Sequence, residues 1–434
     1  MSRASAPRFA LALLAVAGSS FARADVWVVD IQAGPGHDFT QLQAAVDAAA
    51  DGDLILVRDG TYLAPLDILG RSLSIGAEAG AQPQLLSNTA APLRIAQTPV
   101  GGSLILRGLG VQDLVLEDNA GTVWIEDCDL SGRPALAVAN SARVLLVRDT
   151  ITGGDAFYCP SFPGPYCEFP SGIGVDATDS TLWVEGSTLL GGKGADEVGL
   201  DIFQPSAIGA PTAGASAMRV QNGSVQVQGS TLSGGEGGSG SPFVGEIFTP
   251  CWNGQNAGHG LELLGASAAS LDSSLIGGVG GSGDVCDSLF GPPTTMPDGE
   301  PGQAVLFDGA SSYQALSGSS PELLADSPLR EGESLNATFQ GGAFELAALA
   351  LADSSFSLQL SGLLGWLHLG PNFVLLGSTG LDASGSGALS FPIPANLLPA
   401  GVEGRLLYLQ AAVCGAGGCA FTPPSALSVL DGAL

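Results

Sequence analysis

Apolar and polar residues alternate in a series of short segments that end in Gly or Ser. Five of these segments match one another, namely Val123–Gly132, Val144–Gly153, Leu182–Gly191, Val225–Gly234 and Ala268–Gly277. Alternation with a period of two is typical of β-strands with one buried face. No amphipathic helical pattern separates the segments, which excludes a βαβ arrangement. The pattern therefore predicts a repeat built from strands.

The repeat has a basic unit of about 21 residues, which insertions hide. Leu130, Ile151, Leu189, Leu232 and Leu275 are equivalent and follow one another at 21, 38, 43 and 43 residues. The longer spacings correspond to the unit plus one loop. Short all-strand units that stack over a continuous apolar column form a β-solenoid. One column holds Cys128, Asp149, Ser187, Ser230 and Ser273, and we expect these side chains to form a structural ladder of hydrogen bonds.

The segment before the repeats predicts a helix. Thr40–Gln43 fits a capping box, and Leu42, Val46 and Ala49 fall on one helical face. An open solenoid edge must be covered. We therefore expect this helix to lie across the first coil as an N-terminal cap.

These residues also resemble a known family. Asp38–Val46 and Ala50–Tyr62 resemble the opening of right-handed parallel β-helix proteins of the pectin-lyase-like superfamily, and Ser72–Ile75 and Ser103–Leu109 look like its next coils. The resemblance spans about residues 26–318. It implies a right-handed parallel β-helix of seven or more coils. It implies no particular activity, because the superfamily holds lyases, hydrolases, epimerases and non-catalytic repeat proteins.

The 21-residue unit stops near Pro321, and Leu-rich strands with Gly/Pro turns follow, which predicts a β-sandwich-like domain. It resembles C-terminal β-domains of secreted bacterial repeat proteins, and we expect it to cap the open end of the solenoid or to tether the protein. The fold class is thus all-β, with a signal peptide at 1–24, a β-helix at 25–318 and the second domain at 319–434.

The first 24 residues read as a secretory signal. Arg3 and Arg8 precede the apolar run Phe9–Ala17, and Ala22–Ala24 offers a small-x-small cleavage site. We expect a secreted, periplasmic or cell-surface protein with no transmembrane segment after cleavage. Disulfides suit that compartment. The predicted pairs are Cys159–Cys167, Cys251–Cys286 and Cys414–Cys419, with Cys128 reduced.

The chain is strongly acidic. It has 14 Lys and Arg against 42 Asp and Glu, for a formal charge of −28. So few cations cannot neutralise a nucleic-acid backbone or hold an anionic lipid surface. The scattered histidines and the cysteine spacing predict no metal site, and we expect no cofactor. The alternative is Ca²⁺ on carboxylates of the loops, for which no specific motif is present.

Four loops, at about 155–172, 193–215, 236–258 and 279–302, leave the same corner of successive coils and should lie side by side. Aromatic rings in such loops stack on sugar faces, and the residues we select as ligand-binding are Trp252, Tyr158, Tyr166 and Phe248. The competing interpretation is that the loops pack on one another as a small hydrophobic cluster.

Three residues are candidates for catalysis. Gly258–Gly260 places His259 in the Gly-His-Gly of polygalacturonase-type hydrolases, which it resembles, but the Asn-x-Asp, Asp-Asp and Arg-x-Lys motifs of those enzymes are missing. Glu126 and Glu185 stack two coils apart, at a distance that a glycosidase could use. Their competing interpretation is solvent-facing strand positions.

The function that we expect is that of a non-catalytic secreted β-helix protein whose loop face binds carbohydrate or another cell-envelope component. The alternative is a polysaccharide lyase or glycoside hydrolase of the pectin-lyase-like type.

Overall fold

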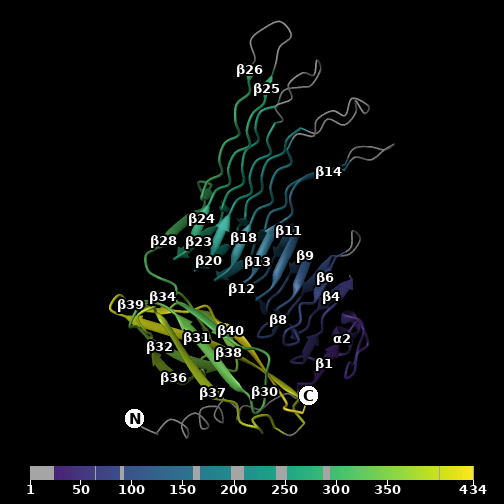
Figure 1. Ribbon diagram of the computed structural model, residues 1–434, viewed down its shortest axis with the longest axis vertical. Helices are drawn as coiled ribbons and strands as arrows, with labels where there is room; N and C mark the ends of the chain where they lie inside the picture. Colours follow the sequence, from purple (N-terminus) through teal and green to yellow (C-terminus); the bar gives the residue numbers. More distant parts are fainter. Residues whose placement is uncertain are drawn as a thin grey trace.

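The computed structural model describes residues 24–63, 65–87, 92–159, 167–196, 210–240, 252–286, 294–399 and 401–433. Within these residues the regular structure is β-strand apart from one helix, α2 (Leu42–Ala48). Long parallel sheets build the first part of the chain, and a second all-β unit lies beside them (Figure 1). The predicted all-β solenoid class is confirmed.

One face of the solenoid is a ten-stranded parallel sheet, called sheet A. Successive coils pair in register, so Val123 faces Leu104 on one side and Val144 on the other. In order, its strands are β1 (Val26–Val29), β2 (Leu54–Val57), β5 (Ser74–Ala77), β8 (Ser103–Arg107), β10 (Thr122–Glu126), β12 (Arg143–Val147), β17 (Thr181–Glu185), β20 (Ser224–Gln228), β23 (Ser267–Leu271) and β28 (Ser312–Leu316).

The opposite face, sheet B, holds two strand segments for each of the later coils. The first segments are β13 (Thr150–Gly153), β18 (Thr188–Leu190), β21 (Thr231–Ser233) and β24 (Ser274–Ile276), and the second are β16 (Val175–Thr178), β19 (Met218–Gln221), β22 (Leu261–Leu264) and β27 (Val305–Phe307). The long strand β11 (Asp129–Ala139) joins the two rows. Earlier coils supply β3 (Thr61–Leu63), β4 (Leu66–Leu69), β6 (Gln84–Leu86), β7 (Leu93–Ala96) and β9 (Gly110–Glu117).

From β8 to β23, each coil turns from sheet A to sheet B through a residue with left-handed backbone. Asp127, Arg148 and Gly186 hold this place, with φ of 54°, 56° and 63°. Gly, Asn and Asp adopt this conformation at the least cost. Their recurrence in the sequence therefore marks the corners of the coils.

Apolar side chains from both sheets fill the space between them. Ile125, Leu146 and Val184 of sheet A, like Leu130 and Ile151 of sheet B, are fully buried. The predicted ladder follows the turn next to this core. The amide of Cys128 donates to Asp149 Oδ1 at 2.8 Å, that of Asp149 to Ser187 Oγ at 3.0 Å, and the same bond continues through Ser230 and Ser273.

Helix α2 forms where predicted and buries Leu42, Ala45 and Val46 in the solenoid core. The predicted capping box is wrong, because the N-cap is Gln41 and no side chain caps the helix. Gln43, the expected capping partner, instead bonds both the N–H and the C=O of Asp67 in β4. That pairing fixes the helix against the next coil.

The C-terminal part contains two facing sheets around an apolar core that includes Leu335, Phe339, Leu349, Leu409 and Val429. One sheet is β29 (Glu322–Ala325), β31 (Ser334–Gln340) and β37 (Ser386–Pro392). The other is β30 (Leu329–Arg330), β40 (Ser425–Leu430), β38 (Gly404–Gly415), β32 (Leu346–Ala352) and β36 (Val374–Gly380). In the same sheet β39 (Gly418–Phe421) pairs with β38, and β34 (Leu363–Leu364) pairs with β39. A pair, β33 (Ser355–Leu358) and β35 (Leu367–Leu369), faces the solenoid.

This C-terminal part packs along the outer face of sheet A rather than over the open end of the solenoid (Figure 1). Ile105, Trp124 and Leu145 of sheet A share an apolar cluster with Leu367 and Tyr408. The outer face of sheet A carries large apolar side chains, and their burial drives the contact.

Candidate binding site

Four long insertions leave sheet B between its two rows of strands, as the sequence predicts. We call them arms 1 to 4, for residues 154–174, 191–217, 234–260 and 277–304. Each has an outgoing and a returning limb, and the limbs run side by side away from the coils (Figure 1). Arm 1 includes the strands β14 (Phe157–Cys159) and β15 (Cys167–Phe169), and arm 4 includes β25 (Val285–Cys286) and β26 (Thr294–Thr295).

Backbone hydrogen bonds join the limbs with a period of three residues. Gly235 and Gly238 donate to the returning limb of arm 2, at Ala215 and Thr212. Gly237 and Gly240 donate instead to the outgoing limb of arm 4, and Gly234 donates to Ile276 at the end of β24. A strand would alternate with a period of two, whereas three residues per turn is the period of the extended polyproline II helix. The described limbs of arms 2 to 4 therefore form a bundle of polyglycine-type helices.

The glycines of this bundle are required by close packing. A Cβ on Gly258 would lie 1.8 Å from the carbonyl oxygen of Ala215, and one on Gly281 would lie 1.9 Å from that of Gly238. Neither glycine has a positive φ. As in the collagen triple helix, only Gly lets the backbones approach so closely. The sequence shows this as glycines three residues apart, a signal that the prediction of ordinary loops overlooked.

His259 lies at the base of arm 3, half-buried. Its Nδ1 accepts the N–H of Gln303 at 2.9 Å, and Asn256 Oδ1 likewise accepts the N–H of Glu300. In arm 3 the equivalent amides donate to carbonyls of arm 4. The returning limb of arm 4 has no fifth arm beside it to accept hydrogen bonds from its N–H groups. His259 and Asn256 of arm 3 accept two of these hydrogen bonds instead.

The candidate aromatic residues are spread over two arms. Tyr158 in arm 1 donates from its hydroxyl to the carbonyl of Ala210 in arm 2. Trp252 begins the described returning limb of arm 3, where its ring is half-buried. Tyr166 and Phe248 lie outside the described residues. The structure also stacks Phe157 on Phe169 at 4.6 Å, which agrees in part with the interpretation that the loops pack on one another.

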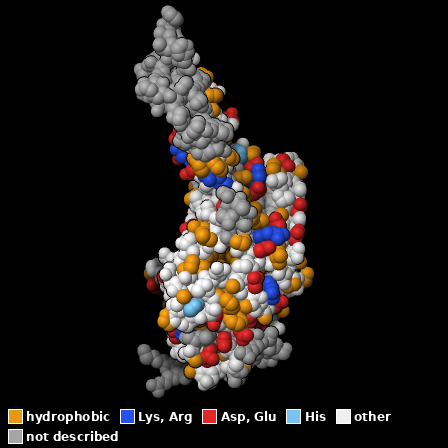
Figure 2. All heavy atoms as spheres, turned by 90° about the vertical axis from the view of Figure 1, so that its right-hand side faces the viewer, with side chains coloured by type: hydrophobic (Ala, Val, Ile, Leu, Met, Phe, Trp, Pro, Cys, Tyr) orange, Lys and Arg blue, Asp and Glu red, His pale blue; other side chains and the backbone are white. Residues whose placement is uncertain are grey.

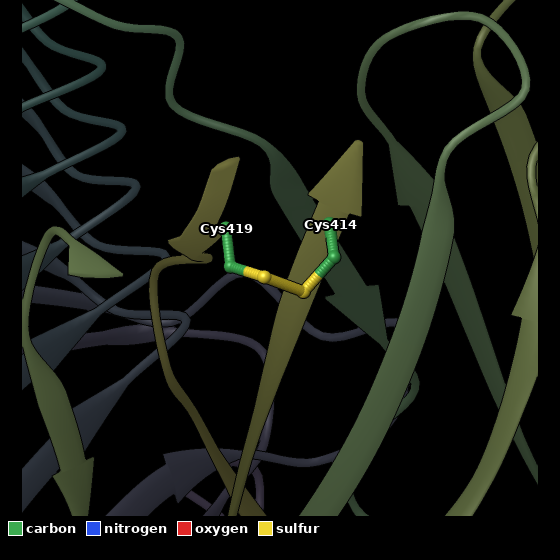
Figure 3. The surroundings of a disulfide bond; sticks show 2 residues. All are labelled: Cys414 and Cys419. Atoms are coloured by element: carbon green, nitrogen blue, oxygen red, sulfur yellow. A yellow bond between two sulfur atoms is a disulfide. The ribbon is translucent and has the colours of Figure 1, made fainter. Parts of the chain in front are cut away.

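One predicted disulfide is present in the described structure, between Cys414 and Cys419 in the β38–β39 hairpin (Figure 3). Cys128 is free and buried, and burial raises its pKa well above the usual range. Cys159 and Cys167 face each other in the β14–β15 pair, but their side chains lie outside the described part. The same holds for the side chain of Cys286, and for Cys251 altogether.

Glu126 and Glu185 stack as expected, with Val147 between them in the register of sheet A. The interpretation that they face solvent is wrong, since both are buried under the C-terminal part. Glu126 accepts hydrogen bonds from the hydroxyl of Ser425, at 2.7 Å, and from the N–H of Ala426. It also pairs with Arg148. Alternation identifies the outer face of a strand but does not show what covers that face.

Glu185 belongs to a chain of polar contacts that no local motif announces. Its Oε1 lies 2.6 Å from His368 Nε2, and His368 Nδ1 lies 2.8 Å from Ser357 Oγ. Serine, histidine and a carboxylate in this order can form a hydrolytic nucleophile. Here His368 is fully buried, and Arg143 Nε donates to the same Ser357 Oγ. The arrangement fits a polar link between the C-terminal part and sheet A.

The basic side chains of the arms and central coils are engaged. Arg219 forms a bidentate pair with Asp176, and Lys193 lies 3.3 Å from Asp196. Arg143 is enclosed in the contact with the C-terminal part, where burial lowers its pKa to about 10. On the face in Figure 2 the basic side chains lie beside acidic ones. This arrangement offers little to the carboxylates of a polyuronate.

No group of three or more His, Cys, Asp or Glu in the described part of the chain is placed to hold a metal ion. Among the same residues, no helix combines the length and the apolar character that crossing a membrane requires.

No protein-family model matches the chain, and no curated protein sequence matches it. One similar structure is a superoxide reductase (neelaredoxin) from Ignicoccus hospitalis, with a TM-score of 0.17, 10% identity, and coverage of 25% of this chain and 80% of that chain. Another is the enzymatically active domain of tailspike protein 2 of bacteriophage CBA120, with a TM-score of 0.26, 10% identity, and coverage of 90% and 74%. At these scores neither likeness assigns an activity to the chain.

Proposed function

We propose that the protein is a non-catalytic, secreted β-solenoid that binds carbohydrate of a cell envelope through its four arms. The observation that carries the proposal is the bundle of arms. In arms 2 to 4, each described limb is fixed to its neighbours by backbone hydrogen bonds every third residue. Such lateral bonding makes a rigid support, and binding residues are typically held by loops on a rigid scaffold.

The proposal includes the finer features that the resemblance implies. The solenoid is right-handed, as in the pectin-lyase-like superfamily, and α2 covers its first coil. A signal peptide at 1–24 directs export. The domains divide at about residue 318.

The placement of the acidic candidates favours binding over catalysis. Glu126 and Glu185 lie on sheet A beneath the C-terminal part, whereas the arms leave sheet B. A glycosidase needs two carboxylates on either side of an accessible sugar bond. Both oxygens of Glu126 are instead occupied by protein donors.

Four single-arm variants test the proposal. In arm 4 a short turn near the coil can connect the outgoing limb to the returning limb, because the two limbs are adjacent there. The N–H of Gly302 donates to the carbonyl of Gly278 at 2.9 Å. Each shortened protein is compared with the full chain for binding to a glycan array and to isolated envelope polysaccharides, after circular dichroism has shown intact β-structure.

We expect saturable binding by the full chain and its loss in at least one shortened protein. Absence of binding by the full chain to every glycan and polysaccharide, or unchanged binding by all four variants, would refute the proposal. Release of unsaturated or reducing ends from the polysaccharides would favour the lyase or hydrolase instead.

A further inference from the structure

The last coil of the solenoid ends in an open edge. Its strands β24, β27 and β28 each pair with the preceding coil, and among the described residues no further strand lies beside them. The C-terminal part packs against sheet A and leaves this end open (Figure 1). Phe307 and Ile276 are 54% and 48% exposed here, and Val305 and Tyr313 cover the core only in part. The apolar core therefore ends at a surface.

The opposite edge of sheet A, at β1, is closed by other parts of the chain. The N–H of Val26 donates to Glu403 Oε2 at 3.0 Å, and the N–H of Val28 donates to Asp38 Oδ2 at 2.8 Å. The carbonyl of Val28 accepts from the N–H of Asp38 at 2.8 Å. Because these backbone groups are already paired, β1 offers no edge to the last coil of another copy. Head-to-tail stacking into a filament is thus disfavoured.

The edge strand β28, in contrast, turns free backbone groups outward. The N–H of Ser312 donates to the carbonyl of Ala266 in the preceding coil at 3.0 Å. Backbone groups alternate in direction along a strand, so Tyr313 and Ala315 turn their N–H and C=O groups away from β23. Natural proteins protect such an edge with charged residues or Pro. The strands β24, β27 and β28 contain neither, in a chain with 42 Asp and Glu.

Arm 4 is open on the same side. In arm 3 the N–H of Gly237 donates to the carbonyl of Val279 in arm 4 at 2.9 Å. Gly280 is the equivalent of Gly237 in arm 4. Among the described residues no group accepts the N–H of Gly280, or that of Gly277 three positions earlier. Donors with this spacing match an extended segment with three residues per turn.

The partner must therefore match two periods at once, two residues in the coil and three in the arm. A second copy of this chain has strands and an arm in the same relative position. The strand β28 is also complementary to itself, because its sequence is Ser-Tyr-Gln-Ala-Leu. Antiparallel pairing about a two-fold axis at Gln314 places the large Tyr313 opposite the small Ala315 of the second copy. These are the two residues with outward backbone groups, so each such pair exchanges both of its hydrogen bonds.

We infer that the protein forms a two-fold symmetric dimer, joined end to end through the last coil and the base of arm 4. The contact uses the same surface on both copies, so the assembly closes at two chains. An axis that crosses both sheets keeps sheet B of the two copies on one side, and both sets of arms then project together. The inference goes beyond the proposed function and does not depend on carbohydrate binding.

Sedimentation velocity of the full chain over a range of concentrations tests the dimer. Gln314 is exposed, and in the proposed register it faces its own counterpart. Gln314→Glu and Gln314→Lys each place two like charges opposite one another, whereas an equimolar mixture of the two variants places opposite charges there. Gln32→Glu is the matched control, because Gln32 is exposed at the other end of the solenoid. Circular dichroism checks that each variant keeps its β-structure.

We expect the wild type and the control to dimerise, each Gln314 variant to raise the dissociation constant at least about tenfold, and the mixture to form heterodimers. A wild type that stays monomeric throughout the micromolar range overturns the inference. So does a dimer that neither variant weakens, because its contact lies elsewhere. Variants that are monomeric both alone and in the mixture overturn the two-fold register at Gln314.

Discussion

A single buried acid, Asp149, stands out in the ladder of the solenoid. The equivalent places in the next coils hold Ser187, Ser230 and Ser273, which accept the same amide bond without a charge. Asp149 is 1% exposed, and burial raises its pKa well above the usual range. Its position favours a neutral hydrogen-bond acceptor.

We therefore predict that Asp149→Ser raises the melting temperature at pH 7. The folded state holds the proton of Asp149 more tightly than the unfolded state, whose pKa is about 3.9. Folding stability is thus lost as pH rises above that value toward the raised pKa, and serine removes this loss. Thermal unfolding should show a gain at pH 7 that disappears near pH 3.

The matched change is Ser187→Ala, which removes the acceptor of the Asp149 amide. It should cost about 1 kcal/mol at both pH values. A melting temperature of Asp149→Ser at or below that of the wild type at pH 7 would contradict the prediction.

At the scale of the element, the arms depend on backbones that touch. Gly258 lies where the returning limb of arm 3 meets those of arms 2 and 4, and its N–H and C=O both take part in the bundle. A side chain there must push neighbouring backbone aside, because carbonyl groups in a hydrogen-bonded network cannot rotate away cheaply. We therefore expect such a side chain to break hydrogen bonds between the arms while the coils of the solenoid stay folded.

Gly258→Ala should open the arms and leave the solenoid folded. Hydrogen exchange followed by mass spectrometry should show faster exchange across arms 2 to 4 and unchanged exchange in sheet A. Gly309→Ala is the control, because a Cβ there meets no atom within 4 Å. Equal exchange in the two variants would show that the close contact does not hold the bundle together.

At the scale of the whole molecule, a buried charge cluster joins the two parts of the chain. Glu126 lies between Arg148 and Arg107 and accepts bonds from Ser425 and Ala426, about 300 residues later in sequence. Although burial alone would lower it, the pKa of Arg148 is raised because Glu126 and Asp127 adjoin its guanidinium group. The cluster is neutralised only when every member is present.

Glu126→Gln should therefore destabilise the protein by about 3–5 kcal/mol, the cost of leaving a buried charge unpaired. Denaturant unfolding followed by tryptophan fluorescence reports on the contact, because Trp124 and Trp183 lie within it. Glu322→Gln, an exposed position, is the control and should change stability little. A similar small effect for Glu126→Gln would show that the cluster does not hold the two parts together.

The local pattern of residues was enough to predict the coils. Alternation with a period of two, the 21-residue unit and the column from Cys128 to Ser273 are set by neighbouring coils, and each coil repeats the same contacts. The exit of the four arms from one side follows from the same repeat. Glycines three residues apart are also visible in the sequence. Only the hydrogen bonds between the limbs show that these segments form the helices of a bundle.

The tertiary structure alone decided what covers the outer face of sheet A. In sequence, Glu126 and Glu185 look like solvent-facing strand positions, and Ser357 and His368 belong to no motif. They meet because the C-terminal part packs on Trp124 and Leu145. This contact brings Glu185 and His368, which lie 183 positions apart in the sequence, within hydrogen-bonding distance. Repeats encode contacts between neighbours, whereas a contact between two unlike surfaces leaves no period in the sequence.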